Sequence, residues 1–453
     1  MNESLGVSIH PNAAKALNKR AVRILDSLAP VPLPARPVAV FRPDVHVSAH
    51  LTEKDLDGPI LVGQVDYRGK EVTKYFQHGG RTIVVQGEGF QQLASLAEEV
   101  HQSETNRNYV SVQCLIECGF RWLTRRYRGE TSEAFTEFVL REAGALVREV
   151  EIWFPLHRVY LESEIKVGKI TFKTVTKEML DRQIGQLPND LPPEQRAAVE
   201  ASFNRTRSKL QGCAAATIRL LAEPIRAEEI ASEEAECSIA ALRFFHPANG
   251  TPYTRAYCTK SGRENVATTC TLTVKDGMIE LLRESSDSKT SLMWVVSDID
   301  IRQFRQAGLD TLSQLLAKEG RSPFEKDLLD AFLIYSRNSL FDDPASRLIH
   351  ILAATESILV RDKNEPIQKN LAERLAFLVG LTVEERMAIR DRVPNIYGLR
   401  SGFLHHGRSF TAMDALEPFM RDIWMAFVVL IRNIDKFRNK QELIDHLERR
   451  KME

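Results

Sequence analysis

Cysteine pairs are missing from this sequence. Its six cysteines are scattered, no CxxC motif occurs, and neither Cys114 nor Cys118 has a nearby histidine to complete a zinc set. This pattern argues against a disulfide framework and against a local zinc site. We therefore expect reduced structural thiols, and neither a metal nor a cofactor.

Long hydrophobic runs are also missing. The longest strongly apolar run, near Met425–Ile431, is far shorter than the roughly 20 residues that cross a bilayer. The first residues lack the basic and apolar segments of a secretory signal. These absences predict a cytoplasmic protein that does not associate with membranes.

An excess of charge of either sign is absent as well. Lys+Arg and Asp+Glu are 61 each, so the formal net charge is +0. Proteins that coat nucleic acid non-specifically are usually strongly basic, and the balance argues against that class while leaving room for a local phosphate site. The 453 residues, 43% of them hydrophobic, are enough for two or three domains.

The first 320 residues show strand and helix signals in alternation. Short β-branched or aromatic runs predict strands, and longer mixed runs predict helices. A Pro-rich segment near residue 190 suggests an internal boundary, and whether 190–320 is a separate domain stays open. We interpret 1–320 as an α+β sensor or regulatory region. The predicted strands are 37–41, 60–67, 82–85, 109–114, 169–175, 213–222, 265–273 and 291–296, and the predicted helices are 11–28, 90–102, 131–149, 193–211, 225–244 and 298–318.

From residue 321 onward strand signals nearly vanish, and the sequence predicts an all-α bundle over 321–453. Ser322-Pro-Phe-Glu325 and Thr382-Val-Glu-Glu385 are capping boxes, and Asp343-Pro344 opens a helix in a similar way. A further helix over 365–379 stops at a glycine. Pro394 is expected to interrupt the next helix, so that a short helix from about 395 follows it, and a long final helix comes after Gly407.

Arg400 and His405 are the candidate catalytic residues in this bundle. Arginine is permanently cationic and binds a phosphate through two parallel N–H hydrogen bonds, whereas histidine exchanges protons near neutral pH. On an ideal helix, five residues turn the chain by about 500°, which directs the two side chains about 140° apart. Either Pro394 and Gly402 loosen the helix, or two copies of the chain face each other in a symmetric dimer.

Glu356 is a candidate supporting residue. It falls on an apolar flank of its predicted helix, where a carboxylate is costly unless paired. Arg400 and Arg374 are the candidate partners. The pair would either hold the guanidinium of Arg400 in place or serve as a structural salt bridge within the bundle.

These residues resemble the Apea-like HEPN domain family. The resemblance rests on three elements in order, which are Arg347–Glu356, Asn370–Leu378 and the stretch Tyr397-x-x-Arg400-Ser-x-x-x-His405-His406-Gly407. It implies a helical bundle that dimerises and acts as a metal-independent ribonuclease, with Arg400 and His405 filling the motif Arg-x4-6-His. His406 also fits that spacing. Ser401 stands where the wider superfamily often has Asn, Asp or His, and it can hydrogen-bond but not act as an acid or base.

The resemblance implies an RNA substrate and a homodimer formed through the C-terminal bundle. A histidine would take the proton from an RNA 2′-OH, and arginine would stabilise the charge on phosphorus. Related proteins serve in phage defence or toxin-like growth arrest, with a trigger or ligand for the N-terminal region that the sequence does not name. The alternative is a non-catalytic HEPN dimerisation module whose N-terminal region recognises a ligand or a partner.

A weaker signal for RNA binding lies in 121–128, where four arginines alternate with two aromatic residues. Such interleaving suits base stacking with phosphate contact. It is more typical of a solvated helix face whose aromatic residues pack inward. The four candidates are Arg121, Arg125, Arg126 and Arg128.

Overall fold

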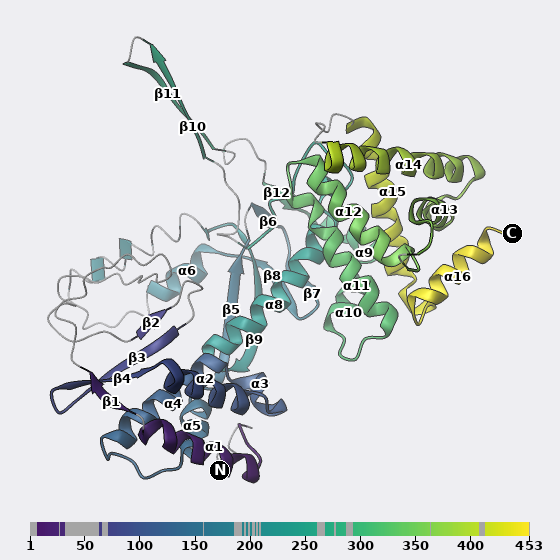
Figure 1. Cartoon of the computed structure of the whole chain (residues 1–453). Coiled ribbons are helices and arrows are strands. Elements are labelled where there is room, and N and C mark those ends of the chain that lie inside the picture. The colour runs from purple at the N-terminus through teal and green to yellow at the C-terminus, as the bar shows by residue number, and fades with distance from the viewer. Residues whose placement is uncertain are drawn as a thin grey trace. The chain divides into compact units, whose positions relative to one another are not determined.

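The computed structural model describes most of the chain (Figure 1). The described residues are 7–26, 28–31, 63–65, 71–156, 158–184, 193, 196–197, 200–201, 204, 207, 210–260, 268–275, 278–286, 293–362, 364–406 and 413–452. An α+β region precedes a helical C-terminal region, as the sequence predicts. Within the described residues, no helix combines the length and the hydropathy needed to cross a membrane.

The chain forms two compact units whose bounds differ from the predicted division. The first comprises Met1–Ile152 with Arg219–Ala231, and the second comprises Trp153–Ile218 with Ser232–Glu453. None of the changes of unit falls at residue 190 or at residue 320. The helices from 321 onward therefore share their unit with strands that come earlier in the sequence.

Up to residue 152, the described part of the first unit contains an antiparallel sheet and five helices. The sheet has the order β1-β4-β3-β2, from β1 (Ala29–Val31), β2 (Gly63–Val65), β3 (Glu71–His78) and β4 (Arg81–Gln86). The helices are α1 (Pro11–Asp26), α2 (Gly87–His101), α3 (Glu104–Tyr109), α4 (Val112–Tyr127) and α5 (Phe135–Gly144). Leu93, Leu115 and Trp122 are among the buried residues of the core that the helices share.

Two sequence predictions in this unit are wrong in detail. The predicted strand 109–114 is the junction between α3 and α4. The Ser111 hydroxyl accepts the backbone N–H of Cys114 and starts α4, so Cys114 and Cys118 lie one turn apart on its buried side. The predicted helix 131–149 is shorter, because β5 (Arg148–Pro155) begins soon after α5. The predicted strand 37–41 lies outside the described residues.

The remaining strands match the sequence in part, because β5, β6, β7 and β11 were not predicted. A second antiparallel sheet has the order β5-β9-β8-β7, with β7 (Ile165–Val167), β8 (Ile170–Thr174) and β9 (Ala214–Ala222). β6 (Val159–Leu161) pairs in parallel with β12 (Trp294–Val296), and β10 (Thr268–Lys275) forms a hairpin with β11 (Met278–Ser286). In the sequence, α6 (Lys177–Ile184) lies between β8 and β9, and α8 (Pro224–Arg243) follows β9. Strands predicted over 169–175 and 213–222, and the helix predicted over 225–244, are confirmed by β8, β9 and α8.

The C-terminal part of the second unit is helical. Its helices are α9 (Asp298–Gln306), α10 (Leu309–Ala317), α11 (Pro323–Ser336), α12 (Pro344–Leu359), α13 (Ile367–Val379), α14 (Val383–His406), α15 (Met413–Arg432) and α16 (Lys440–Arg450). The single helix predicted over 298–318 is two helices, because Gly308 adopts a φ of 111° between them. The sequence also missed α16, which follows the helix expected to be the last.

Helix caps in this region follow the predicted pattern. Ser322 and Glu325 form both bonds of a capping box, and Asp343 accepts the N–H groups of two residues after it. Thr382 and Glu385 also cap reciprocally. These caps set where α11, α12 and α14 begin, and thereby which side chains each helix buries.

Pro394 does not interrupt its helix, contrary to the prediction. α14 runs without a break from Val383 to His406 with Pro394 inside it. Pro394 lies on the exposed side, where water can bind the carbonyl that loses its N–H partner. Val393 and Ile396 on the opposite side are fully buried, and their burial offsets part of the cost of the missing bond.

Candidate functional site

Glu356, Tyr397 and Arg400 meet between α12 and α14. Tyr397 Oη donates a hydrogen bond of 2.7 Å to Glu356 Oε1, and Arg400 Nη1 contacts the same oxygen at 3.4 Å. Tyr397 and Arg400 lie three residues apart on α14, a spacing that places both on the side of the helix that faces α12. The structure therefore brings together Glu356 and Arg400, one of the two pairings that the sequence offered.

Arg400 keeps most of its hydrogen-bonding capacity in this arrangement. Its side chain is 36% exposed, and that of Glu356 is 25% exposed. Only one long contact, from Nη1, goes to the carboxylate, and Nε is buried with no hydrogen-bond partner in the part of the chain that the structure describes. A guanidinium carries five N–H donors, so this one is anchored without being saturated.

Tyr397 acts only as a donor here. Burial, followed by the hydrogen bond to the Glu356 carboxylate, raises the pKa of Tyr397 far above its usual value. The phenol thus stays protonated at any ordinary pH and keeps its bond to Glu356. This role of Tyr397 was not predicted, although its spacing to Arg400 is a signal that could have revealed it.

Arg374 does not join this cluster, which corrects the second pairing offered for Glu356. It is buried on α13 and bonds Glu365 at 2.6 and 2.9 Å and Glu448 at 2.9 Å. Burial by itself would raise the pKa of Glu365, but the hydrogen bonds that it accepts, chiefly from Arg374, lower that pKa to about 2. Arg374 therefore ties α13 to α16 and to the loop before α13.

His405 and His406 are the last residues of α14, and their side chains lie outside the described residues. Ser401 is exposed on the same helix. Because α14 is continuous, the five residues from Arg400 to His405 rise by about 7.5 Å and turn by about 500°. On a regular helix these two positions face about 140° apart, and the convergence of Arg400 with His405 stays a prediction.

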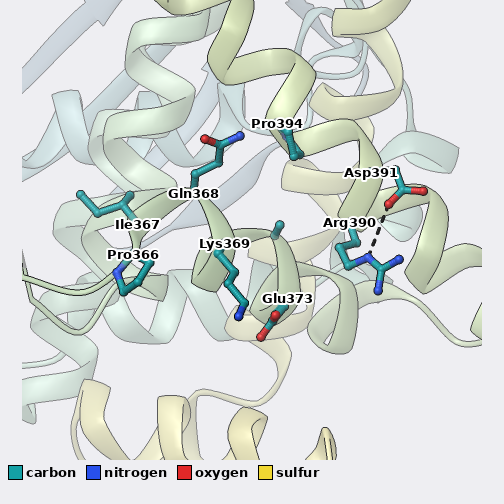
Figure 2. A pocket seen from close by; sticks show the side chains of 9 residues that line it. Pro366, Ile367, Gln368, Lys369, Glu373, Arg390, Asp391 and Pro394 are labelled. Atoms are coloured by element: carbon teal, nitrogen blue, oxygen red, sulfur yellow. Dashed lines mark hydrogen bonds and ion pairs between the residues drawn. The ribbon is translucent and has the colours of Figure 1, made fainter.

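A groove lies beside α14, between it and α13 (Figure 2). Its volume is ≈ 610 Å³. Arg390, Asp391 and Pro394 form its α14 side. The residues on the other side are Pro366, Ile367, Gln368, Lys369, Ala372 and Glu373. The charged side chains of the lining are of both signs, two cationic and two anionic, so the groove is not a basic channel.

The four arginines singled out near the end of α4 make contacts within their own unit. Arg121 pairs with Glu142 at 3.0 Å, and Arg125 lies 5.6 Å from the centroid of the Phe138 ring. Arg126 and Arg128 donate to the backbone carbonyls of Thr131 and Gln77. Trp122 is buried, as expected for a solvated helix face with inward aromatic residues. RNA binding by these arginines stays a prediction.

Two buried arginines outside the candidate site were not anticipated. Arg243 donates to the carbonyls of Ser336 and Cys258, and Arg347 donates to those of Thr254 and Ala248. Both guanidiniums hold the segment after α8 against α11 and α12. Arg347 opens the first of the three elements on which the family resemblance rests, and its role here is structural.

Comparisons with known proteins add no identification. No protein-family model, no curated protein and no solved structure matches the chain. Among the described residues, no group of three or more His, Cys, Asp or Glu is placed to hold a metal ion. The functional argument thus rests on the residues themselves.

Proposed function

We propose that the C-terminal helical region is an endoribonuclease of the HEPN type, in which Arg400 and His405 carry the reaction. The observation that carries this proposal is the state of Arg400, whose Nη1 contacts Glu356 at 3.4 Å while 36% of the side chain stays exposed to a phosphate. The half-buried carboxylate of Glu356 holds this cation in place. Little free energy is therefore needed to orient the cation as charge develops on a phosphate.

The reaction needs only groups that this chain supplies. His405 takes the proton of an RNA 2′-OH, and the resulting oxygen attacks the adjacent phosphorus. Arg400 donates to the non-bridging oxygens as their charge increases. The bond from phosphorus to the 5′-oxygen breaks, and a protonated imidazole, either a second His405 or His406, gives that oxygen its proton. The products are a 2′,3′-cyclic phosphate and a 5′-OH, and Ser401 contributes only hydrogen bonding.

Two copies of the chain are part of the proposal. On an ideal helix the positions of Arg400 and His405 face about 140° apart, so a twofold mate would supply the group that one chain cannot bring to the same phosphate. The N-terminal α+β region, residues 1–320, recognises a ligand or restrains the enzyme until a trigger arrives. A role in phage defence or growth arrest rests on the family resemblance alone.

One observation favours a second candidate function, a non-catalytic dimerisation module. The Glu356 side chain is 25% exposed, and its bonds from Tyr397 and Arg400 satisfy a carboxylate that would otherwise be costly to bury. A purely structural bridge accounts for the same contacts. This alternative predicts that no RNA is cut and that Arg400→Ala alters only stability.

The test is cleavage of total RNA in EDTA by the purified protein beside Arg400→Ala and His405→Ala. We expect cleavage by the wild type that is lost in both variants, with Arg361→Ala, whose exposed pair with Asp445 lies outside the groove, as a matched control that retains it. Cleavage that persists in both Arg400→Ala and His405→Ala would assign the activity to another site.

A further inference from the structure

The groove between α13 and α14 has walls that suit a small, flat molecule. Its apolar lining consists of Pro366, Ile367 and Ala372 on one side and Pro394 on the other. Ala372 is buried and presents only a methyl group, and the two prolines place one rigid ring on each side (Figure 2). The volume of ≈ 610 Å³ lies within the usual range of small-ligand sites, about 300–1,000 Å³. Mostly apolar walls with a few polar groups are also typical of such sites.

The charges of the lining leave one cation without a partner. Glu373 is bonded by Lys451 at 2.9 Å, and Asp391 contacts the neighbouring Arg390 at 3.4 Å. Lys369 is exposed at the groove and has neither a hydrogen bond nor an ion pair within the described part of the chain. An ammonium group in this position can pair with one negative charge, whereas the two carboxylates of the lining would repel a polyanion. The groove therefore suits a ligand with a single negative charge.

Pro394 adds a hydrogen-bond acceptor to the same groove. Proline has no N–H, so the carbonyl of Arg390, four residues earlier on α14, receives no helical bond from this position. A helical carbonyl points along the axis toward the residue four positions ahead, and both residues line the groove. An N–H or O–H group on a ligand can therefore take the place of the missing donor.

We propose that this groove binds a small aromatic carboxylic acid that carries an N–H or O–H group on its ring. The ring packs against Pro394, and its donor bonds the carbonyl of Arg390. The carboxylate reaches across the groove to Lys369. Each of these contacts uses a group that the chain leaves open, so no contact within the protein has to break when the ligand binds.

The class of ligand follows from what the groove offers. One unpaired ammonium group balances one carboxylate, whereas a phosphate would bring more negative charge toward Glu373 and Asp391. A flat ring can pack against the ring of Pro394, and a rigid ring loses less conformational entropy on binding than a flexible chain does. The site does not depend on the proposed ribonuclease, because none of its lining residues carries that reaction.

Indole-3-butyrate is the probe for this site, because it combines a flat ring, a ring N–H and one carboxylate. Isothermal titration calorimetry of the purified protein should show saturable binding below about 1 mM. Three analogues separate the contacts. Indole-3-butyramide lacks the negative charge, 1-methylindole-3-butyrate lacks the ring donor, and dodecanoate has the charge without the ring. We expect each analogue to bind about tenfold more weakly than indole-3-butyrate.

Two variants locate the probe in the groove. Lys369→Met removes the cation, so it should weaken binding of indole-3-butyrate about tenfold and leave binding of the uncharged amide unchanged. Pro394→Ala restores the helical N–H, so the preference for the probe with a ring N–H over its methylated analogue should disappear. Lys326→Met replaces an exposed lysine of α11 outside the groove and is the matched control, which should change neither affinity.

The possible outcomes decide the proposal. No saturable binding of indole-3-butyrate up to about 1 mM would overturn the site. Equal affinity in Lys369→Met and the wild type would place the probe elsewhere and overturn it as well. Tighter binding of dodecanoate would overturn the aromatic class, and a preference for the ring N–H that persists in Pro394→Ala would overturn the role of the carbonyl. Lys369 is exposed, so its variant should melt at the same temperature as the wild type.

Discussion

Tyr397 and Glu356 join α14 to α12 through a hydrogen bond of 2.7 Å from the tyrosine hydroxyl to the carboxylate Oε1. Arg400 contacts that oxygen at 3.4 Å, so the phenol and the guanidinium share one acceptor. The shorter bond fixes the position of the carboxylate, and the carboxylate in turn limits where the guanidinium lies. The placement of the proposed phosphate-binding cation therefore depends on a neutral hydroxyl one helical turn before it.

Tyr397→Phe removes this donor and keeps the ring. Hydrogen bonds to charged acceptors contribute about 1.5–3 kcal/mol, so we expect urea unfolding to show a loss of about 2 kcal/mol. Tyr253→Phe is the matched control, because the Tyr253 hydroxyl bonds Asp414 at 3.0 Å on a residue that is 59% exposed. Its loss should stay below about 0.5 kcal/mol. Equal losses in the two variants would show that the Tyr397–Glu356 bond contributes no more to the free energy of unfolding than the exposed Tyr253–Asp414 bond does.

Arg374→Met tests the buried cation of α13. The substitution leaves the half-buried Glu365 without its main partner, and breaking a buried pair from one side typically costs about 3–5 kcal/mol. Arg361→Gln removes an exposed pair with Asp445 and should cost less than about 1 kcal/mol. Chemical denaturation of both variants measures the difference. A small loss in Arg374→Met would contradict a structural role for this residue.

Acid should weaken the fold through Glu365. Its pKa is about 2 in the folded protein and about 4.3 in an unfolded chain, so the unfolded chain binds the proton first as the pH falls. The stabilisation is complete above the unfolded pKa and is lost as the pH approaches 2, amounting to about 3 kcal/mol. Urea midpoints between pH 5 and pH 2 should fall steeply in the wild type and more gently in Glu365→Gln. Parallel slopes would contradict this assignment.

His246 should destabilise the fold in a milder acid range. Burial, followed by repulsion from Arg347 and Arg243, lowers the pKa of His246 to about 4, and its Nδ1 accepts the N–H of Ala248. The unfolded chain takes up this proton near pH 6.5, so stability is present above that pH and declines as the pH falls toward 4. NMR titration of the imidazole measures the pKa directly. A value near 6.5 in the folded protein would be inconsistent with the buried environment.

Gly398→Ala tests an open position on α14. Alanine there should stabilise the fold by about 1 kcal/mol, because a Cβ would meet no described atom within 4 Å and glycine is costly inside a helix. Gly308→Ala should do the reverse, because its φ is 111° and a Cβ would lie 3.0 Å from Ile431. Urea unfolding of both variants measures the two changes. Destabilisation by Gly398→Ala would contradict the open position of that glycine.

The sequence predicted those features that depend on neighbouring residues. The capping pairs of α11, α12 and α14 and the strands β8 and β9 formed where local chemistry placed them. Gly308 divided a predicted helix, because its left-handed backbone depends on tertiary packing as well as on the residue type. Pro394 was expected to end a helix, but burial of the opposite face keeps α14 intact, and that energy is not visible in a local pattern.

The residue pairings at the candidate site could also be predicted only in part from the sequence. Pairing of Glu356 with Arg400 was one of two choices that spacing allowed, and only the packing of α12 against α14 decided between them. Arg374 was the other choice, but it bonds Glu365 in the loop before α13 and Glu448 on α16. The sequence did not predict α16, so the second of these partners was not foreseeable. Tyr397 was part of the motif but had no predicted role. Its hydroxyl bonds Glu356 on another helix, and that pairing depends on how α12 packs against α14.

The most direct test of the account is single-turnover cleavage of a defined RNA and of the same strand with one 2′-deoxy nucleotide at the cut position, both in EDTA. The wild-type protein should cut the RNA, leave a 2′,3′-cyclic phosphate, and leave the deoxy-substituted strand intact, and Arg400→Ala should be slower by at least about a hundredfold. Cleavage of the deoxy-substituted strand at the same position, or an Arg400→Ala rate equal to that of the wild type, would contradict it.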